Sequence, residues 1–313
     1  MRTFKQLQDA VLQWMADGSD TGLLRDLVSN SINEQHQQLL HEDRYDFMLW
    51  PRTESLAVVS GQSAYALHPE FDQPLYFFNP NTEDYLEEIP AKSLLESGAD
   101  WDNATPTEPI RFMLAGISKL KKQPTADGVV AIATTGGTES ASNQIIVSGI
   151  DNNGDYVNET LSSGAPWTTL TSTTSFEVVL DITKIGASWA RLVTVTSGSD
   201  TLLTLNADEF GRQYRMMEII GTPAGSSTIK YRFYRKPRYL VKDNDIPDLP
   251  ESHDDILVLK ALTAMQGYSR ATDDEQAYWR ARLSKLDQSL KMTYQQARSL
   301  GGRPTFTRFI PRG

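Results

Sequence analysis

The side chains that could do chemistry are few and scattered along this chain. Its histidines are His36, His41, His68 and His253, and the first two lie five residues apart, which turns them off a common helix face. The chain has no cysteine, which excludes disulfides, thiolate catalysis and cysteine-bound zinc. It also lacks a glycine-rich phosphate loop and the H-E-x-x-H and G-x-S-x-G motifs. The sequence therefore predicts no enzyme, no metal site and no cofactor.

One short acidic run resembles a calcium loop. Asp151-Asn152-Asn153-Gly154-Asp155 places oxygen ligands at alternate positions. An EF-hand loop needs glycine at its sixth position and glutamate at its twelfth, where this chain has Tyr156 and Ser162. We interpret the run as an Asn-Gly hairpin turn between two strands.

The C-terminal segment combines positive charge with aromatic side chains. After Asp287 the chain has no acid. The basic residues that follow it are Lys291, Arg298, Arg303, Arg308 and Arg312. Such an arm can dock in an acidic groove of a partner protein, bind nucleic acid or be a disordered end. Its prolines favour docking, because a restricted backbone loses less entropy on binding.

Helical patterns stand at both ends of the chain. Phe4, Leu7, Val11 and Trp14 form one apolar stripe, and Leu24, Val28, Ile32 and Leu39 form a second. The polar run 35–38 interrupts the second stripe, so that helix is exposed along part of its length or packs on another subunit. Near the other end, residues 252–255 predict a helix N-cap and residues 272–275 a capping box. The apolar stripe of this last helix is Leu283, Leu286, Leu290 and Ala297.

The centre of the chain has the alternation of β-strands. Ser55–Val59 and Ser63–Leu67 flank a turn, and residues 110–114 form a further strand. Tyr214–Ile220 and Thr228–Tyr234 predict a hairpin around a glycine- and proline-rich tip.

Residues 118–209 differ in being rich in Thr, Ser, Gly and Val. The short β-runs there are Gly128–Ala133, Gln144–Gly149, Tyr156–Leu161, Ser175–Ile182, Arg191–Thr196 and Leu202–Leu205. Their spacing predicts a small β-sandwich. The side chains expected in its core are Trp167, Phe176, Val178 and Trp189.

We therefore predict an α+β fold, in which N- and C-terminal helices form a helical bundle with short β-strands at its centre. An immunoglobulin-like β-sandwich is inserted between two of these strands. The predicted parts are 1–117 (two helices, then β), 118–209 (the insertion), 210–300 (a β-hairpin, then two helices) and 301–313 (an extended basic arm).

The charge of the chain is unevenly distributed. Over its 313 residues the net charge is −10, made up of −12 in residues 1–117, −5 in 118–209 and +7 in 210–313. Such asymmetry is typical of a docking tail or a nucleic-acid surface, or of charge scattered over a solvated surface. The chain shows neither a membrane-length apolar run nor a signal peptide, so we expect no membrane anchor and no export by the usual route.

Two segments resemble phage structural proteins. Tyr231–Leu262, YRFYRKPRYLVKDNDIPDLPESHDDILVLKAL, resembles the region of head-to-tail adaptors of short-tailed phages where a last strand runs through an acidic, proline-marked turn into a helix. IIVSGIDNNGDYVNETLSSG and the TSTTSFEVVLDIT that follows resemble the immunoglobulin-like domains of virion proteins. The N-terminal helices and the basic arm are also similar to the adaptor family.

The resemblance implies a virion protein of the head–tail junction, assembled in the host cytoplasm as a ring of twelve subunits under the portal. The ring would bind a tail nozzle or tail-tube protein and continue the channel through which DNA passes without specific binding. Tail fibres are a further expected partner, through the inserted domain. The arm residues that it implies as portal contacts are Arg303, Phe306, Arg308, Phe309 and Arg312.

Two other functions stay open at this point. A receptor- or glycan-binding tail component would act through the β-sandwich, with Trp167 and Trp189 as stacking platforms for sugar rings. Exposed tryptophans favour that interpretation, whereas buried ones favour a packed core. A cell-wall hydrolase carried on the virion is the third possibility.

Overall fold

A computed structural model of the chain describes residues 1–15, 22–42, 44–90, 108–124, 126–186, 188–221, 223–268 and 271–294. They form two compact units. Unit 1 combines the described residues of 1–50 with those after 233, and unit 2 contains those of 51–233. Within the described ranges, no helix has both the length and the apolar character that a membrane span requires.

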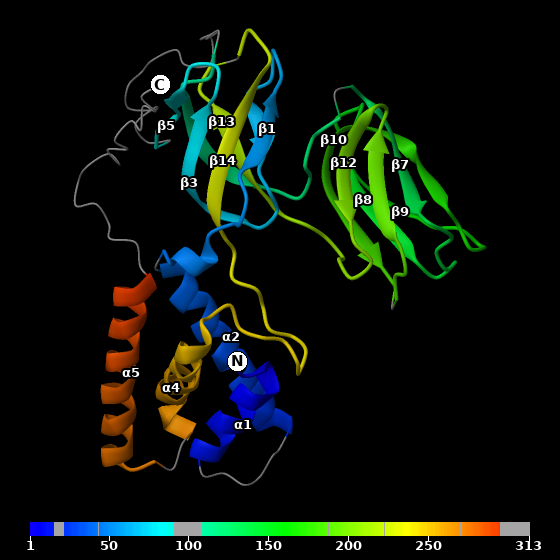
Figure 1. Cartoon of the computed structure of the whole chain (residues 1–313). Helices are drawn as coiled ribbons and strands as arrows, with labels where there is room; N and C mark the ends of the chain where they lie inside the picture. The colour runs from blue at the N-terminus through cyan, green and yellow to red at the C-terminus, as the bar shows by residue number, and fades with distance from the viewer. Residues whose placement is uncertain are drawn as a thin grey trace. The chain divides into compact units, whose positions relative to one another are not determined.

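Unit 1 takes its helices from both ends of the chain, as the apolar stripes predict (Figure 1). They are α1 (Phe4–Trp14), α2 (Gly22–Glu42), α4 (Asp255–Ala264) and α5 (Asp273–Tyr294), with 3-10 turns η1 (Asp46–Met48), η2 (Glu251–His253) and η3 (Gln266–Tyr268). The predicted side chains Phe4, Leu7 and Val11 are buried. Thr3 and Gln6 form a capping box that satisfies backbone N–H groups at the start of α1.

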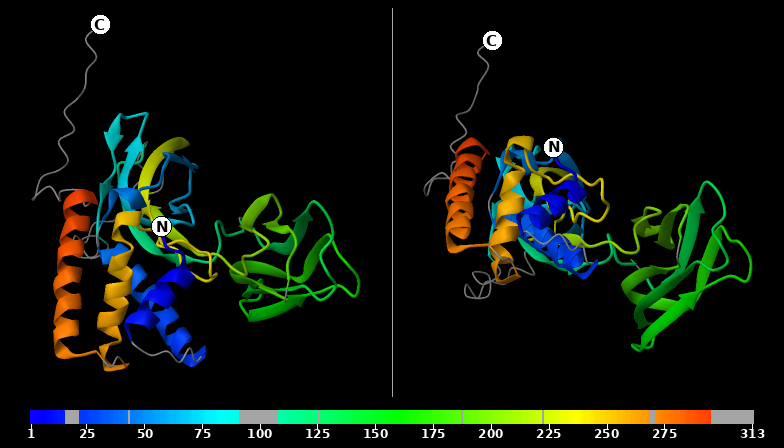
Figure 2. Two further views of the ribbon diagram at one scale, coloured as in Figure 1. Left: turned by 60° about the horizontal axis from the view of Figure 1, so that its bottom comes forward. Right: turned by 90° about the horizontal axis from the view of Figure 1, so that it is seen from below.

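Helix α4 lies at the centre of unit 1. Every residue from 256 to 262 except Lys260 is buried, and a helix that is apolar on all sides must be covered on all sides. Helices α1, α2 and α5 all pack against it. Figures 1 and 2 show α5 on one side of α4, and α1 and α2 on the other.

The two predicted caps near the C-terminus have different outcomes. At the start of α5, Thr272 and Glu275 bind each other's backbone N–H groups, so the predicted capping box is confirmed. The N-cap predicted within 252–255 is Asp254, with Asp255 in the first turn, but the Asp254 side chain makes no cap bond to its own helix. Its carboxylate instead accepts from the backbone N–H of Arg2 at 2.8 Å, which joins the two ends of unit 1.

Helix α5 is buried at few points. Trp279 and Leu290 are its only buried side chains in the described part. The rings of Trp279 and Trp14 are arranged edge to face, with centroids 6.3 Å apart. Leu283 and Leu286, which the predicted stripe also placed in the core, are only half-buried. Packing against α4 accounts for this pattern, since α4 is the main neighbour of α5.

Unit 2 begins with two four-stranded sheets. The first sheet contains, in order, β1 (Glu54–Val58), β14 (Ser227–Arg235), β3 (Phe71–Asn79) and β4 (Asp84–Tyr85). The second sheet contains, in order, β2 (Ala64–Ala66), β13 (Tyr214–Ile219), β6 (Arg111–Ser118) and β5 (Glu87–Glu88). Phe77 of the first sheet and Phe112 of the second pack with ring centroids 4.5 Å apart. Both are buried, so the sheets share an aromatic core.

The predicted hairpin between Tyr214–Ile220 and Thr228–Tyr234 is wrong. Both runs are strands, but β13 pairs with β2 and β6, whereas β14 pairs with β1. The turn between them carries the chain from one sheet to the other. A local turn signal specifies that the chain reverses, but it does not specify which strand becomes the neighbour.

The second part of unit 2 is a six-stranded antiparallel sheet. Its strands are, in order, β12 (Asp200–Leu205), β11 (Leu192–Ser197), β7 (Gly128–Thr135), β10 (Thr169–Ile185), β8 (Gln144–Asp151) and β9 (Tyr156–Leu161). All six predicted β-runs are strands. The long β10 pairs first with β7 and then with β8, and one core cluster takes residues from all six strands. The sheet therefore curls around a common core; its immunoglobulin-like identity stays a prediction.

Three of the four predicted core side chains are correct. Trp167, Phe176 and Trp189 are buried, but Val178 is only half-buried and its neighbour Val179 takes its place. The register of β10 against β8 shifts at this point. Such a bulge inserts one residue and reverses which side chains face inward.

The six-stranded sheet is inserted between two paired strands. Strand β6 precedes it, strand β13 follows it, and these two pair antiparallel with Ser118 opposite Tyr214. The chain therefore leaves the small sheet and returns to it at neighbouring positions.

Candidate functional site

The five predicted arm contacts, from Arg303 to Arg312, lie outside the described residues. The last described residue is Tyr294, at the end of α5. Its ring contacts Phe47 of η1, with centroids 5.5 Å apart, and His253 of η2, with centroids 5.8 Å apart. The described end of α5 is therefore held in place by two other parts of unit 1.

A long loop of unit 1 is fixed along the N-terminal helices. This strap, residues 236–250, connects β14 to η2. The side chain of Asn33 in α2 holds its middle, donating to the carbonyl of Leu240 at 2.9 Å and accepting from its N–H at 2.8 Å. Backbone N–H groups of Phe4 and Lys5 donate to strap carbonyls, at 2.7 and 3.0 Å. These bonds also satisfy free donors in the first turn of α1.

The polar run in α2 binds this strap. The Gln37 amide donates to the carbonyls of Pro237 and Arg238, each at 3.1 Å. His36 is fully buried, and its Nε2 accepts from the backbone N–H of Asp248 at 3.1 Å. The polar groups that interrupt the apolar stripe thus bind another segment of the same chain. No pattern in the sequence predicts this partner.

His36 and Asp248 form a buried polar centre with two arginines. Desolvation lowers the pKa of His36 to about 4, although the nearby Asp248 charge opposes this. The Asp248 carboxylate lies 2.8 Å from Arg235 and 2.9 Å from Arg238. Burial alone would raise the pKa of Asp248, but the hydrogen bonds and charges of these arginines outweigh it and lower the pKa.

This centre is suited to holding structure rather than to catalysis. A backbone N–H occupies Nε2 of His36, so that nitrogen is not available as a general base. The Asp248 side chain is almost completely buried under its two arginines. The arrangement fixes the strap on α2.

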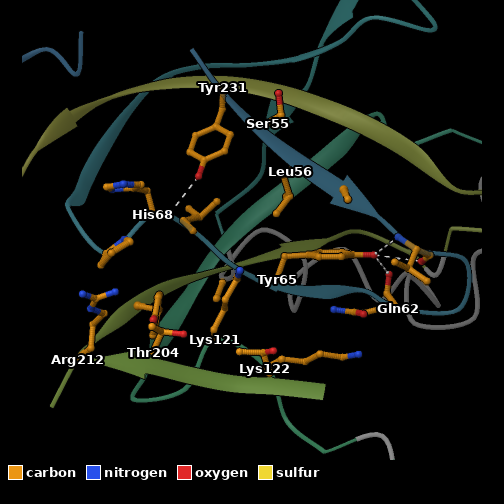
Figure 3. A pocket seen from close by; sticks show the side chains of 17 residues that line it. Ser55, Leu56, Gln62, Tyr65, His68, Lys121, Lys122, Thr204, Arg212 and Tyr231 are labelled. Carbon is orange, nitrogen blue, oxygen red and sulfur yellow. Dashed lines mark hydrogen bonds between the residues drawn. The ribbon is translucent and has the colours of Figure 1, made fainter. Parts of the chain in front are cut away.

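Unit 2 contains a cavity with a volume of about 580 Å³ (Figure 3). Its polar groups come from separate segments. The Tyr231 hydroxyl accepts from the backbone N–H of His68 at 3.1 Å, and burial raises the pKa of Tyr231 to about 12. The Tyr65 hydroxyl donates to the carbonyl of Gln62 at 2.7 Å. Both phenols are therefore neutral groups in existing hydrogen bonds.

Basic side chains also line this cavity. They are Lys121, Lys122 and Arg212. Lys122 lies 2.5 Å from Asp200, and Arg212 is paired with Glu209, so these two cations are already neutralised. Apart from His68, none of these lining residues is a candidate for chemistry in the sequence. They are dispersed in the chain at no motif spacing, so no signal could have found them.

Metal binding has no support in the part of the chain that the structure describes. No group of three or more histidine, aspartate or glutamate side chains there could hold an ion. The Asp151 run forms the turn between β8 and β9: its carboxylate accepts from the N–H groups of Asn153 and Asp155, at 2.8 and 3.0 Å. Gly154 has a φ of +86°, which favours glycine. The hairpin interpretation is confirmed, and the same hydrogen bonds lower the pKa of Asp151.

The two tryptophans considered as sugar platforms are buried. Trp167 is 4% and Trp189 8% exposed, and their rings contact edge to face with centroids 6.0 Å apart. The indole N–H of Trp167 donates to the carbonyl of Asn143 at 3.1 Å. They are core residues, and neither presents a face for stacking on a sugar ring.

A protein-family comparison matches the N-terminal part of the chain. Residues 2–136 match a family described as SU10 adaptor protein. The matched segment contains α1, α2 and the strands from β1 to β7. No protein in the curated set matches the chain. The match supports a structural role as a phage adaptor.

Proposed function

We propose that this protein is a head-to-tail adaptor of a phage virion. It forms a ring under the portal, joins the capsid to the tail and continues the DNA channel at the head–tail junction. The observation that carries this proposal is the match of residues 2–136 to the SU10 adaptor family. The adaptor role is structural and requires neither an active site nor a cofactor.

The portal contact in this proposal is the C-terminal arm. Its candidate contact residues are Arg303, Phe306, Arg308, Phe309 and Arg312. Arginine and aromatic side chains are enriched among the residues that dominate protein interfaces. The contacts of Tyr294 with Phe47 and His253 support this role, because they fix the end of α5, the last described element before the arm.

The remaining partners follow from the same role. A ring of twelve subunits carries a tail nozzle or tail-tube protein on its other side, and the six-stranded domain is available for tail fibres. With a net charge of −10, the chain is suited to a conduit from which DNA phosphates are repelled rather than retained.

Binding to portal rings of the same phage tests the proposal. The full chain and a chain truncated after Ser299 are compared, with a control in which the residues after Ser299 are shuffled at constant composition. We expect the intact chain alone to form a ring complex. If the truncated chain binds equally well, the adaptor role stands but the arm is not the docking element. If no form binds, the adaptor role is wrong.

The glycan-binding alternative is not proposed. It requires exposed aromatic platforms on the six-stranded domain, and the two tryptophans considered for that role are buried.

A further inference from the structure

Two edge strands of unit 2 face the same cavity. Strand β1 stands at the edge of one four-stranded sheet and β2 at the edge of the other. Among the described residues, β1 pairs with β14 alone and β2 with β13 alone. Both edge strands line the cavity of about 580 Å³ in Figure 3, with Leu56 and Ala57 from β1 and Tyr65 from β2. The two sheets are therefore open to this cavity along these edges.

The Tyr65 hydroxyl shows which backbone groups of β1 point away from β14. It lies 3.0 Å from the backbone nitrogen and 3.1 Å from the carbonyl oxygen of Val59, just after the strand. Along a strand, backbone groups point alternately towards one neighbour and the other. The N–H and carbonyl groups of Ser55 and Ala57 therefore point to the same side as those of Val59. Among the described residues, neither Ser55 nor Ala57 has a backbone partner on that side.

This edge of β1 lacks the groups that usually prevent edge strands from pairing. Natural sheet edges are commonly protected by charged side chains, by proline or by a covering segment. Residues 55–58 contain neither a charged side chain nor a proline. The one charge of the strand is Glu54 at its first position, and it is bound to Arg52 at 2.6 Å. The unpaired groups of β1 can therefore act as a template for a further strand.

The cavity beside this edge can receive side chains of such a strand. Its apolar wall includes Leu67 and Tyr231, which are buried, and Leu56, which is half-buried. Alternate side chains of a strand point to the same face, so every second side chain of a strand added to β1 would point into this space. The chemistry that fits is an extended segment with apolar side chains at every second position.

We propose that β1 accepts an extended strand from the tail-side partner of the adaptor, its nozzle or tube protein. The strand pairs with the backbone of Ser55 and Ala57 and inserts apolar side chains into the cavity. In this mode of binding, main-chain hydrogen bonds provide affinity and pockets for alternate side chains provide specificity. The inference rests on the proposed function, in which the C-terminal arm contacts the portal. The tail-side protein is the partner that still requires a docking surface.

Hydrogen–deuterium exchange tests the occupant. The amides of Ser55 and Ala57 are followed in the free chain, in the chain on portal rings, and in that assembly with the nozzle or tube protein of the same phage. We expect exchange to slow about tenfold or more in the last state alone, because a paired amide exchanges only when the pairing opens. Amides of β9, an edge strand of the six-stranded sheet, should not change. Protection on portal rings alone would assign the edge to the portal or a second copy and overturn the proposal, as would unchanged exchange with the tail protein bound.

A proline substitution provides the second test. Proline is tolerated on an edge strand where its missing N–H would face away from the sheet. We therefore expect Ala57→Pro to leave thermal unfolding nearly unchanged but to weaken binding of the tail protein about tenfold, because one pairing N–H is lost. The control Ala57→Val keeps this N–H and should bind as the unmodified chain does.

Three results would overturn the contact. Equal binding by Ala57→Pro and Ala57→Val would show that the N–H of Ala57 pairs with no partner strand. A large fall in the unfolding temperature of Ala57→Pro would show that this N–H belongs to the pairing with β14. An unmodified chain that assembles on portal rings but binds no tail protein would reject the contact while leaving portal docking intact. A chain that fails to assemble on portal rings would reject the adaptor role as well.

Discussion

The backbone N–H of Asp248 donates to Nε2 of His36, 212 positions earlier in the chain, at 3.1 Å. This bond requires an unprotonated Nε2, and burial enforces the same state by lowering the pKa of His36 to about 4. A neutral histidine is therefore part of the native link between α2 and the strap.

Stability should decrease on acidification because of His36. Its pKa is about 4 in the folded protein, against 6.5 for an unperturbed histidine, so the folded state binds this proton less readily than the unfolded chain does. The contribution is present above pH 6.5 and is lost as the pH falls from 6.5 towards 4, by about 3 kcal/mol in full. Urea unfolding at pH 7 and pH 5, followed by far-ultraviolet circular dichroism, should show a shallower pH dependence for His36→Gln. The control His41→Gln, on the exposed side of the same helix, should behave as the unmodified chain does.

Removing the Asn33 amide should release the strap. Asn33→Ala leaves the buried N–H and carbonyl of Leu240 without the partners they have now. An unsatisfied buried polar group costs about 1–3 kcal/mol, so we expect a loss in that range in denaturant unfolding. Asn30→Ala, at an exposed position of the same helix, should change stability by less than about 0.5 kcal/mol. Equal effects of the two substitutions would show that the Asn33–Leu240 bonds do not stabilise the strap.

A methyl group at position 149 should destabilise the six-stranded sheet. A Cβ at Gly149 would collide with the carbonyl oxygen of Val178 and lie 2.7 Å from the Phe176 ring, where the register of β10 shifts. Because a backbone atom must move, we expect Gly149→Ala to cost about 1–3 kcal/mol. Gly116→Ala, which meets no atom within 4 Å, is the matched control. A Gly149→Ala chain as stable as this control in thermal unfolding would contradict the close approach.

Charge and aromatic groups of the arm should contribute differently to portal binding. Replacing Arg303, Arg308 and Arg312 by alanine should reduce affinity and also its dependence on salt, because screening acts on charge. Replacing Phe306 and Phe309 should reduce affinity by about tenfold or more while the salt dependence stays unchanged. Binding assays at two ionic strengths separate the two effects. Identical salt dependence in all variants would argue against a charged contact.

Local sequence patterns predicted where helices and strands lie better than they predicted which strands pair and which segments pack together. All six strands of the inserted sheet and the helices at both ends follow from alternation, three- and four-residue spacing and capping residues, which act over a few positions. The Thr272–Glu275 capping box is an example: both partners lie within one turn, so the sequence alone identifies them. The family match likewise supports the adaptor role that the resemblance implied.

What could not be predicted depends on distant segments. Strands β13 and β14 belong to two different sheets, and these sheets meet through side chains such as Phe77 and Phe112, which are 35 positions apart in the chain. The burial of His36 depends on Asp248, which no spacing rule connects to it. Val178 was misplaced because a bulge is a property of two paired strands, not of one.

Because Ser118 pairs with Tyr214, the inserted domain begins and ends at neighbouring positions of one sheet, and it could be exchanged as a unit. Its two ends meet across one strand spacing, about 5 Å, so any domain whose termini lie that close could occupy the same gap. Replacing it by a short turn would convert β6 and β13 into an ordinary hairpin without changing their register. Gain, loss or replacement of this module is therefore compatible with an unchanged set of contacts in unit 1.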